Sequence, residues 1–364
     1  MESRPYKISK NVEGLSAYVP GEQPQGGVWV KLNTNEFPYP PSPKVREAVL
    51  AELGSDGAPL RLYPQPLSDK LREAVAKYYG VEAKNAIAGN GSDDILNLIM
   101  RAFGGGNLKV AAMNPSYSLY PVLSKMQGAE FIEFDFNRDY SLPLGDIFKS
   151  GANVFILTNP NAPLGLKFDE PVLEEIAQNF KGLFVIDEAY APFSGYTAAR
   201  LALKYDNVLV VCTSSKGWGL AGMRIGWAMA NERIIEILDR VRDSYNLDRL
   251  AQVAGIAALG DVQYYKNFVQ KVVDAREDFE RFLSAISWDY VKSYSNFVFV
   301  KPKKHGLAGA EAAADFFEFL KSQKILVRFW KNDSKICDGL RVSIGTPEEM
   351  QKFKESALKW KNKE

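Results

Sequence analysis

The stretch Thr213-Ser214-Ser215-Lys216-Gly217-Trp218-Gly219-Leu220-Ala221-Gly222-Met223-Arg224 decides the fold class of this chain. It follows the apolar run 208–212, which is typical of a buried parallel strand. In an open α/β sheet, ligands bind at the ends of such strands. Hydroxyls and backbone N–H groups can surround a phosphate, and an arginine can bind two of its oxygens. The loop therefore predicts a site for a phosphorylated ligand.

The lysine of this loop has more than one possible role. Lys216 could form a Schiff base with a carbonyl cofactor. A Walker P-loop would place Ser or Thr directly after its lysine, but Gly217 stands there, so that reading fails. A solvated turn with incidental charges remains the plain alternative.

Composition limits the classes of function. The 364 residues suffice for two domains, and 46% hydrophobic with 24% charged residues is ordinary globular composition. A net charge of +1 predicts no nucleic-acid partner, and no apolar stretch is long enough to predict a membrane span. No signal peptide is recognised at the N-terminus, and Cys212 and Cys337 alone imply no disulfide framework, which fits the cytoplasm. The only histidine, His305, is expected in an exposed turn, so we predict no metal site.

Strands and helices alternate through the middle of the chain. The expected strands are 109–113, 130–134, 153–157, 183–186, 208–211 and 225–229. The expected helices are 45–53, 67–78, 92–102, 116–126, 171–180, 233–242 and 264–286. This alternation predicts an α/β fold with a mostly parallel sheet covered by helices on both faces. The first forty residues are rich in Pro and Gly and are expected to form an extended arm.

The pattern changes towards the C-terminus. Strands are expected at 297–300, 325–328 and 340–344, around helices at 309–322 and 347–360. This order predicts a smaller α+β unit.

Asp187 and Tyr190 follow the apolar strand 183–186. A carboxylate at the mouth of a buried strand is costly unless a cation meets it. A pyridinium nitrogen is such a cation, and an Asp that keeps it protonated makes the ring an electron sink. Tyr190 could reach the phenolic oxygen of the same ring. The alternative is an N-cap Asp beside a surface Tyr.

Three further segments are informative only in combination. The loop 158–165 could hold the Asn161 amide in one place, or it could be a simple turn. The segment 89–94 opens a helix, whose free N–H groups suit a phosphate. Tyr117 lies just past a strand and could stack on a flat ring, or it could belong to the core.

Two arginines interrupt apolar strands near the C-terminus. Arg341 lies within Leu340-Arg341-Val342-Ser343-Ile344, and Arg328 lies within Ile325-Leu326-Val327-Arg328-Phe329. A guanidinium in such a run is suited to an anion, and a carboxylate is its natural bidentate partner. Either arginine could instead form a structural ion pair.

Taken together, these motifs resemble the fold-type I enzymes that use pyridoxal 5'-phosphate, and most closely the histidinol-phosphate aminotransferases. The matching segments come in the family's order and span almost the whole chain: 32–36, Tyr63-Pro64, 91–94, 161–165, 187–190, 215–224 and 340–346. The resemblance implies an arm at 1–39 that is part of the small domain and the dimer contact, a large cofactor-binding domain at 40–265 and a small α+β domain at 266–364.

The resemblance also implies the cofactor contacts. Lys216 would hold pyridoxal 5'-phosphate covalently and later move the proton. Asp187 would pair with the ring nitrogen, Tyr190 with the ring oxygen, and Tyr117 would stack on the ring. The phosphate would be held by the backbone amides of Ser92 and Asp93, by Thr213, Ser215 and Arg224, and by Tyr63 of a neighbouring subunit. The last contact implies a homodimer with shared active sites.

Small-molecule substrates are expected next to the cofactor. Arg341 would bind the substrate carboxylate, and Arg328 is the candidate for the substrate phosphate. Tyr18 and Asn35 would line the side-chain pocket. One departure stands out: the family usually has Asn-Asn-Pro-Thr-Gly where this chain has Asn161-Ala162-Pro163-Leu164-Gly165. Either Asn161 or Tyr190 alone would then bind the ring oxygen, and we favour Asn161.

The implied reaction is transamination between histidinol phosphate and 2-oxoglutarate, with imidazole acetol phosphate and glutamate as the other pair, in histidine biosynthesis. Two alternatives keep the cofactor: an aromatic amino acid aminotransferase, or a phosphothreonine decarboxylase. A third is a cofactor-bearing regulatory protein, which the short, Pro/Gly-rich segment before Asn33 disfavours.

Overall fold

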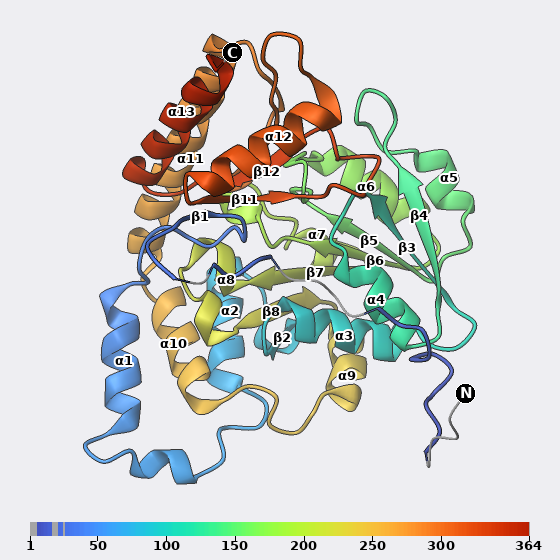
Figure 1. Ribbon diagram of the computed structural model, residues 1–364. Coiled ribbons are helices and arrows are strands. Elements are labelled where there is room, and N and C mark those ends of the chain that lie inside the picture. The colour runs from blue at the N-terminus through green and yellow to red at the C-terminus, as the bar shows by residue number, and fades with distance from the viewer. Residues whose placement is uncertain (1–5, 17–20, 25, 364) are drawn as a thin grey trace.

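A seven-stranded sheet forms the centre of the structure, a computed structural model that describes residues 6–16, 21–24 and 26–363 (Figure 1). Its strands are β2 (Ala86–Gly89), β3 (Lys109–Asn114), β4 (Glu130–Asp135), β5 (Val154–Thr158), β6 (Leu183–Asp187), β7 (Val208–Thr213) and β8 (Gly226–Ala230). Their order is β2-β8-β7-β6-β5-β3-β4. Only β8 runs against its neighbours. The predicted α/β fold with a mostly parallel sheet is confirmed.

The sheet is buried on both faces over most of its width because its inner strands are apolar, whereas the edge strand β4 carries Glu130, Glu133 and Asp135 and has no buried residue. Along β7, Val208, Val210 and Cys212 pack into one hydrophobic cluster, whereas Leu209 and Val211 pack into the other. This alternation is the two-residue period of a strand. Both faces are covered, so a continuous apolar run was the correct signal for these strands.

Different helices cover the two faces. One face packs against α3 (Ser92–Phe103), α4 (Leu119–Met126) and α9 (Glu232–Val241). The other packs mainly against α2 (Asp69–Tyr79), α5 (Leu144–Lys149), α6 (Glu170–Asn179), α7 (Leu201–Lys204), α10 (Arg249–Leu259) and α11 (Val262–Ala285). α1 (Pro43–Leu53) packs on α10 at the side of the molecule (Figure 1).

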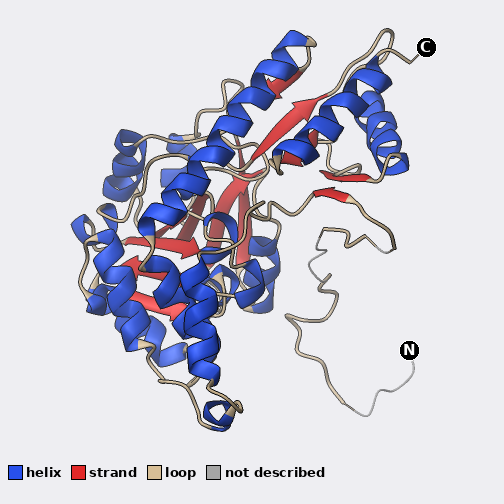
Figure 2. Cartoon of the chain, turned by 90° about the vertical axis from the view of Figure 1, so that its left-hand side faces the viewer, coloured by secondary structure: helices blue, strands red, loops and turns tan. Residues whose placement is uncertain are grey.

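A second sheet of five strands lies beside the first. Its order is β1 (Val30–Leu32), β11 (Ile325–Phe329), β12 (Leu340–Ser343), β10 (Phe297–Lys301) and β9 (Asp289–Val291). All neighbours are antiparallel except β1 and β11. Helices α12 (Gly309–Ser322) and α13 (Pro347–Lys361) lie beside this sheet (Figure 1). Helix α13 packs on both α12 and α11, at the top of Figure 1. Figure 2 shows this smaller unit set apart from the main sheet.

Several elements differ from the expectation. β1 is a strand of the second sheet rather than part of an irregular arm, because its backbone pairs with β11 almost three hundred residues away. The strands β2 and β9 and the helix α10 were not predicted. The expected domain limit between 265 and 266 falls inside the continuous helix α11. We retain the division into arm, large domain and small domain as a proposal. Within the described residues, no helix combines the length and apolarity needed to cross a bilayer.

Candidate active site

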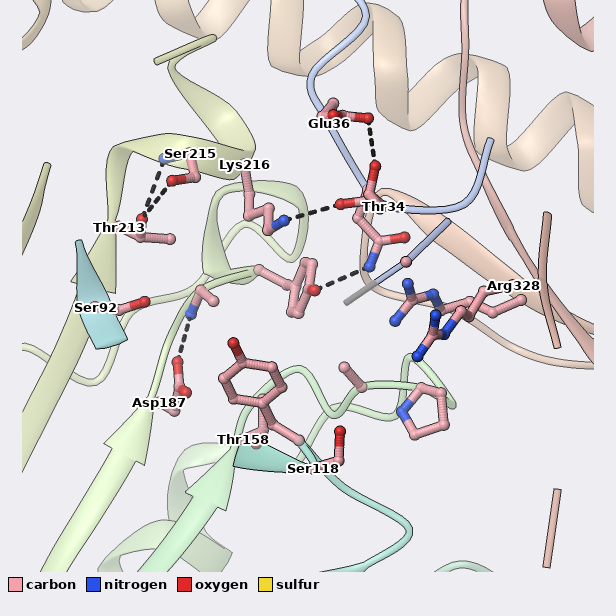
Figure 3. Close-up of a pocket in the computed structure, with 18 of the residues that line it drawn as sticks. Thr34, Glu36, Ser92, Ser118, Thr158, Asp187, Thr213, Ser215, Lys216 and Arg328 are labelled. Atoms are coloured by element: carbon pink, nitrogen blue, oxygen red, sulfur yellow. Dashed lines mark hydrogen bonds between the residues drawn. The ribbon is translucent and has the colours of Figure 1, made fainter. Parts of the chain in front are cut away.

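The carboxyl ends of the parallel strands open into a cavity of about 280 Å³ between the two sheets. Its lining includes most of the predicted site residues: Asn35, Ser92, Asp93, Tyr117, Asp187, Tyr190, Thr213, Ser215, Lys216, Arg224, Arg328 and Arg341. In the view of Figure 3, Ser92, Thr213 and Ser215 lie on one side of Lys216 and Arg328 lies on the other. Residues distant in sequence therefore meet at one sheet edge, as such sheets require.

Lys216 projects into the cavity from the short helix α8 (Ser214–Gly217), which begins where β7 ends. Its Nζ donates a hydrogen bond to the Thr34 carbonyl at 3.0 Å (Figure 3). Removal from water and the nearby positive charge of Arg341 lower the lysine pKa to about 8, although Glu36 acts in the opposite direction. The side chain is therefore suited to give up and regain a proton near neutral pH.

An anion cradle, formed by Gly91, Ser92, Thr213, Ser215 and Arg224, lies at the start of α3. Gly91 is the N-cap of the helix, and Ser92 is its first residue. Arg224 Nη1 lies 3.4 Å from the Ser215 hydroxyl, and Thr213 Oγ1 donates to that hydroxyl at 3.1 Å. Hydroxyls, a guanidinium and the free N–H groups of a helix thus converge on one point.

The cradle depends on a close approach that only glycine permits. A Cβ on Gly91 would lie 2.6 Å from Arg224 Nη2, and the φ of Gly91 is +82°. Arg224 itself has a φ of 51° and forms an ion pair with Asp93 at 3.3 Å. The backbone is therefore shaped to bring the guanidinium against the helix N-terminus.

Asp187 ends β6 and is only 3% exposed. Its Oδ2 accepts a hydrogen bond from the Tyr120 hydroxyl at 2.7 Å, and its Oδ1 accepts one from the Ala189 N–H at 3.1 Å. Burial raises the pKa of Asp187 to about 6, while these two hydrogen bonds lower it. Among the residues that the structure describes, no Lys or Arg forms an ion pair with this carboxylate.

The next residue, Glu188, is buried on a different set of partners. Its carboxylate accepts hydrogen bonds from the Thr197 hydroxyl at 2.6 Å and the Ala198 N–H at 2.5 Å. Burial raises its pKa to about 7, against the effect of the two donors. Glu188 does not line the cavity. The two adjacent carboxyl groups therefore have separate roles, and Glu188 provides a control for Asp187.

The raised pKa of Glu188 predicts a pH-dependent stability. A carboxyl group with a raised pKa stabilises the fold below its unfolded pKa of 4.5, and this contribution is lost as the pH rises to about 7. Between about pH 4.5 and pH 7, the free energy of unfolding of the wild-type protein should therefore fall by about 3 kcal/mol relative to that of Glu188→Gln. Melting temperatures of both cofactor-free proteins at pH 5 and pH 7.5 measure the difference. An unchanged difference would show that Glu188 is ionised throughout.

Asn35 connects the two sheets at the cavity. Its side-chain Nδ2 donates to the Tyr190 hydroxyl at 2.9 Å, and its Oδ1 accepts from the Ser343 hydroxyl at 2.8 Å. Its φ of 56° is left-handed, a conformation that asparagine tolerates better than most residues. Tyr117 lines the cavity, and its hydroxyl donates to Asp93 at 3.1 Å.

Arg328 and Arg341 stand directly opposite each other on β11 and β12. Both line the cavity, and Arg341 Nη2 donates to the Asn33 carbonyl at 2.9 Å. Like charges placed opposite each other destabilise a sheet. The two paired arginines lie where the second sheet faces the cavity, so an anion bound in the cavity would offset their repulsion. The pair therefore indicates a site for anions.

Two predicted residues that the structure describes, Asn161 and Tyr63, do not line the cavity. Asn161 is fully buried; its Nδ2 donates to the Pro115 carbonyl and its Oδ1 accepts from the Leu164 N–H, both at 3.2 Å. Its neighbour Ala162 faces the cavity instead, so this arrangement does not support Asn161 as a ring ligand. Tyr63 is 76% exposed and stacks on Tyr245, away from the cavity. Tyr18 lies outside the described residues.

Other residues belong to the site but were not predicted. Tyr120 holds Asp187 and also bonds Thr158 at 2.7 Å. Thr34 accepts from Lys216, and Trp330 lines the cavity beside the arginines. Thr158 and Trp330 carried a usable signal, because one ends an apolar strand and the other stands two residues after Arg328. Thr34 acts through its backbone, for which no side-chain pattern exists.

The sequence of this chain matches known aminotransferases over most of its length. Residues 28–356 match the family model described as aminotransferase class I and II. The chain is 43% identical over 350 residues to a histidinol-phosphate aminotransferase of Geotalea uraniireducens (strain Rf4), covering 96% of this chain and 98% of that protein.

Solved structures show the same fold. A histidinol-phosphate aminotransferase of Sinorhizobium meliloti in complex with pyridoxal-5'-phosphate matches with a TM-score of 0.87 and 22% identity, covering 99% of this chain and all of that one. An L-threonine-O-3-phosphate decarboxylase of Porphyromonas gingivalis matches with a TM-score of 0.78 and 20% identity, covering 92% and 99%. At such identities these likenesses establish the fold alone.

Proposed function

The chain belongs to the class I and II aminotransferases and, within them, to the histidinol-phosphate aminotransferases, and from this premise we propose that it exchanges an amino group between histidinol phosphate and 2-oxoglutarate with pyridoxal 5'-phosphate as cofactor. The reverse pair is imidazole acetol phosphate and glutamate. One observation carries the proposal: Lys216, Asp187, the anion cradle and two arginines line a single cavity.

The residues present fit this cofactor. Asp187 is a buried carboxylate for which the described residues provide no cationic side-chain partner, and a ring nitrogen that carries a proton would supply one. The anion cradle fits a phosphate group, because hydroxyls, a guanidinium and a helix N-terminus converge there. When bound, the cofactor supplies an aldehyde that links to an amine and a ring that accepts electrons from the substrate.

Each neighbouring residue then has a proposed role. Lys216 would be the point of covalent attachment, Asp187 would hold the ring nitrogen, Tyr190 the ring oxygen and Tyr117 one face of the ring. The phosphate would be held by the N–H groups of Ser92 and Asp93 and by Thr213, Ser215 and Arg224. Asn35 supports Tyr190, since it donates to the tyrosine hydroxyl.

Proton movement falls to Lys216. With a pKa of about 8, about a tenth of the amine is neutral at pH 7, against about one part in three thousand for an ordinary lysine. The neutral amine can take the proton from the substrate α-carbon. It can then give this proton to the carbon of the cofactor's aldehyde group. The bond to the Thr34 carbonyl keeps the amine inside the cavity.

The substrate anions would bind at the other end of the cavity. We assign the carboxylate of glutamate to Arg341 and the phosphate of histidinol phosphate to Arg328, with Asn35 in the same cavity. We propose that Arg341 also contacts the second substrate, because the Asn33 carbonyl accepts a hydrogen bond from its Nη2 and so fixes the guanidinium in the cavity.

A homodimer is part of the proposal. Tyr63 would reach the cofactor phosphate of the neighbouring subunit. The support for the dimer is an apolar surface that the single chain leaves exposed, where Leu60 and Leu62 are each 52% exposed next to Tyr63.

Cys212 and Cys337 are free thiols, and the cytoplasm stays our prediction for the location.

An absorbance titration tests the function. The purified protein should show a cofactor band that shifts to the amine form with histidinol phosphate at lower concentrations than with phenylalanine or phosphothreonine. A stronger response to phenylalanine would favour the aromatic aminotransferase, and release of carbon dioxide from phosphothreonine would favour the decarboxylase. No cofactor band in protein incubated with pyridoxal 5'-phosphate would overturn the proposal.

A further inference from the structure

We propose that Trp330 determines anion specificity in this cavity, by holding the guanidinium groups of Arg328 and Arg341 on one wall so that a phosphate dianion is preferred over a single carboxylate. The inference rests on the proposed function for the identity of the substrate, but its geometry does not.

The two arginines carry like charges at one position of the second sheet. They are paired in register on adjacent antiparallel strands, so their positive charges start from neighbouring backbone positions. Mutual repulsion would drive the two side chains apart. A wall that presents both charges to one ligand therefore depends on something that attracts both guanidinium groups.

Trp330 supplies that attraction. It follows Arg328 by two residues, which places both side chains on the same side of an extended segment. The guanidinium carbon of Arg328 lies 5.3 Å from the indole centroid, and that of Arg341 lies 5.2 Å from it. Both distances are within the ~6 Å over which an indole face attracts a cation.

The indole is itself held in place. It packs against a small hydrophobic cluster formed by Leu164, Val291, Phe299 and Ile336. This cluster joins the loop after β5 to β9 and β10 of the second sheet. Arg341 has a further aromatic neighbour, Phe297, at 5.2 Å, whereas Trp330 contacts both arginines.

This arrangement favours one class of anion. A carboxylate has two oxygens, and a single guanidinium can satisfy both of them. A phosphate monoester carries about two charges and three acceptor oxygens, so it gains from two guanidinium groups at once. Loss of the indole should therefore weaken phosphate binding more than carboxylate binding.

Calorimetric titration of the cofactor-loaded protein with inorganic phosphate, and separately with acetate, tests this inference. The bound cofactor fills the anion cradle, so the probes report on the arginine wall. Trp330→Leu should weaken phosphate binding about tenfold and acetate binding by less than about threefold. Trp330→Phe, which keeps an aromatic face, should recover most of the phosphate affinity.

Phe329→Leu is the matched control. Phe329 is the adjacent aromatic residue, but it packs on Phe317 of α12 and does not line the cavity. This variant should bind both anions as the wild type does. In parallel, the KM for histidinol phosphate should rise about tenfold in Trp330→Leu while kcat changes less than threefold.

Equal losses for phosphate and acetate, or no loss for either, would overturn the role of Trp330. Wild-type protein that binds phosphate but does not turn over histidinol phosphate would instead contradict the proposed function. The calorimetric comparison between Trp330→Leu and wild type would still decide the inference in that case.

Discussion

Replacing Lys216 with alanine should lower kcat for amino transfer by at least about 10³–10⁴-fold. The amine at this position is the only Lys Nζ that lines the cavity within the described residues, and its pKa is lowered to about 8. Without it, the cavity lining that the structure describes offers no other amine to carry the α-proton. Single-turnover absorbance with histidinol phosphate measures this step directly.

Two further variants separate charge from proton transfer. Lys216→Arg keeps a positive charge, but a guanidinium does not give up its proton, so this variant should be as inactive as the alanine. A small amine such as methylamine should partly restore activity to Lys216→Ala, since it can enter the cavity as a base. Lys204→Ala, which removes an exposed lysine paired with Glu174, should be fully active.

A second measurement identifies the point of attachment. Borohydride reduction of the cofactor-loaded wild type should fix the cofactor permanently to the peptide that contains Lys216, as judged by mass spectrometry. Lys216→Ala should bind the cofactor without becoming labelled. Labelling of another lysine, or full activity in Lys216→Ala, would show that the assignment is wrong.

Replacing Asp187 with asparagine should lower kcat by about 10²–10³-fold or more. Asparagine has almost the same shape, and its single oxygen can still accept from the Ala189 N–H, while its amide nitrogen faces the Tyr120 hydroxyl oxygen. It cannot keep a proton on the ring nitrogen, so the ring becomes a poorer electron acceptor. Steady-state rates with histidinol phosphate, together with the cofactor retained after dialysis, measure both effects.

Glu188→Gln is the control for this variant. It makes the same change in charge one residue away, but Glu188 bonds Thr197 and Ala198 rather than facing the cavity. Its kcat should stay within about threefold of the wild type. If Asp187→Asn were as active as Glu188→Gln, the carboxylate at 187 would have no role at the ring.

The main sheet was predictable because its signals are local. Strands β5, β6 and β7 are apolar runs that end in polar residues and are buried on both faces, so no alternation is needed to recognise them; the four-residue strand β2 was missed. The strand 208–211, for example, appears as β7 at Val208–Thr213. Most of the site was predictable for a related reason, since Asp187, Thr213 and Lys216 stand at or just past strand ends that share one edge.

The elements that were missed depend on distant partners. β1 has three residues and is a strand only because β11 pairs with it. The Asn161 side chain was expected at the ring, but the Pro115 carbonyl and the Leu164 N–H engage it in the folded chain. For β1 and for the bond of Asn161 to the Pro115 carbonyl, the partner is identified by the packing and by nothing in the neighbouring sequence.

The amino-acid sequence by itself determined the α/β class and the family, since apolar runs, strand-end polar residues and motif order are properties of neighbouring positions. Only the tertiary structure decided the electrostatics of the site and the contacts of Arg328 and Arg341 with Trp330. The pKa of Lys216 falls because folding removes it from water and brings Arg341 near, and Trp330 meets two guanidinium groups because β11 and β12 pair in one register. Desolvation and long-range contacts of this kind exist only once the chain is packed.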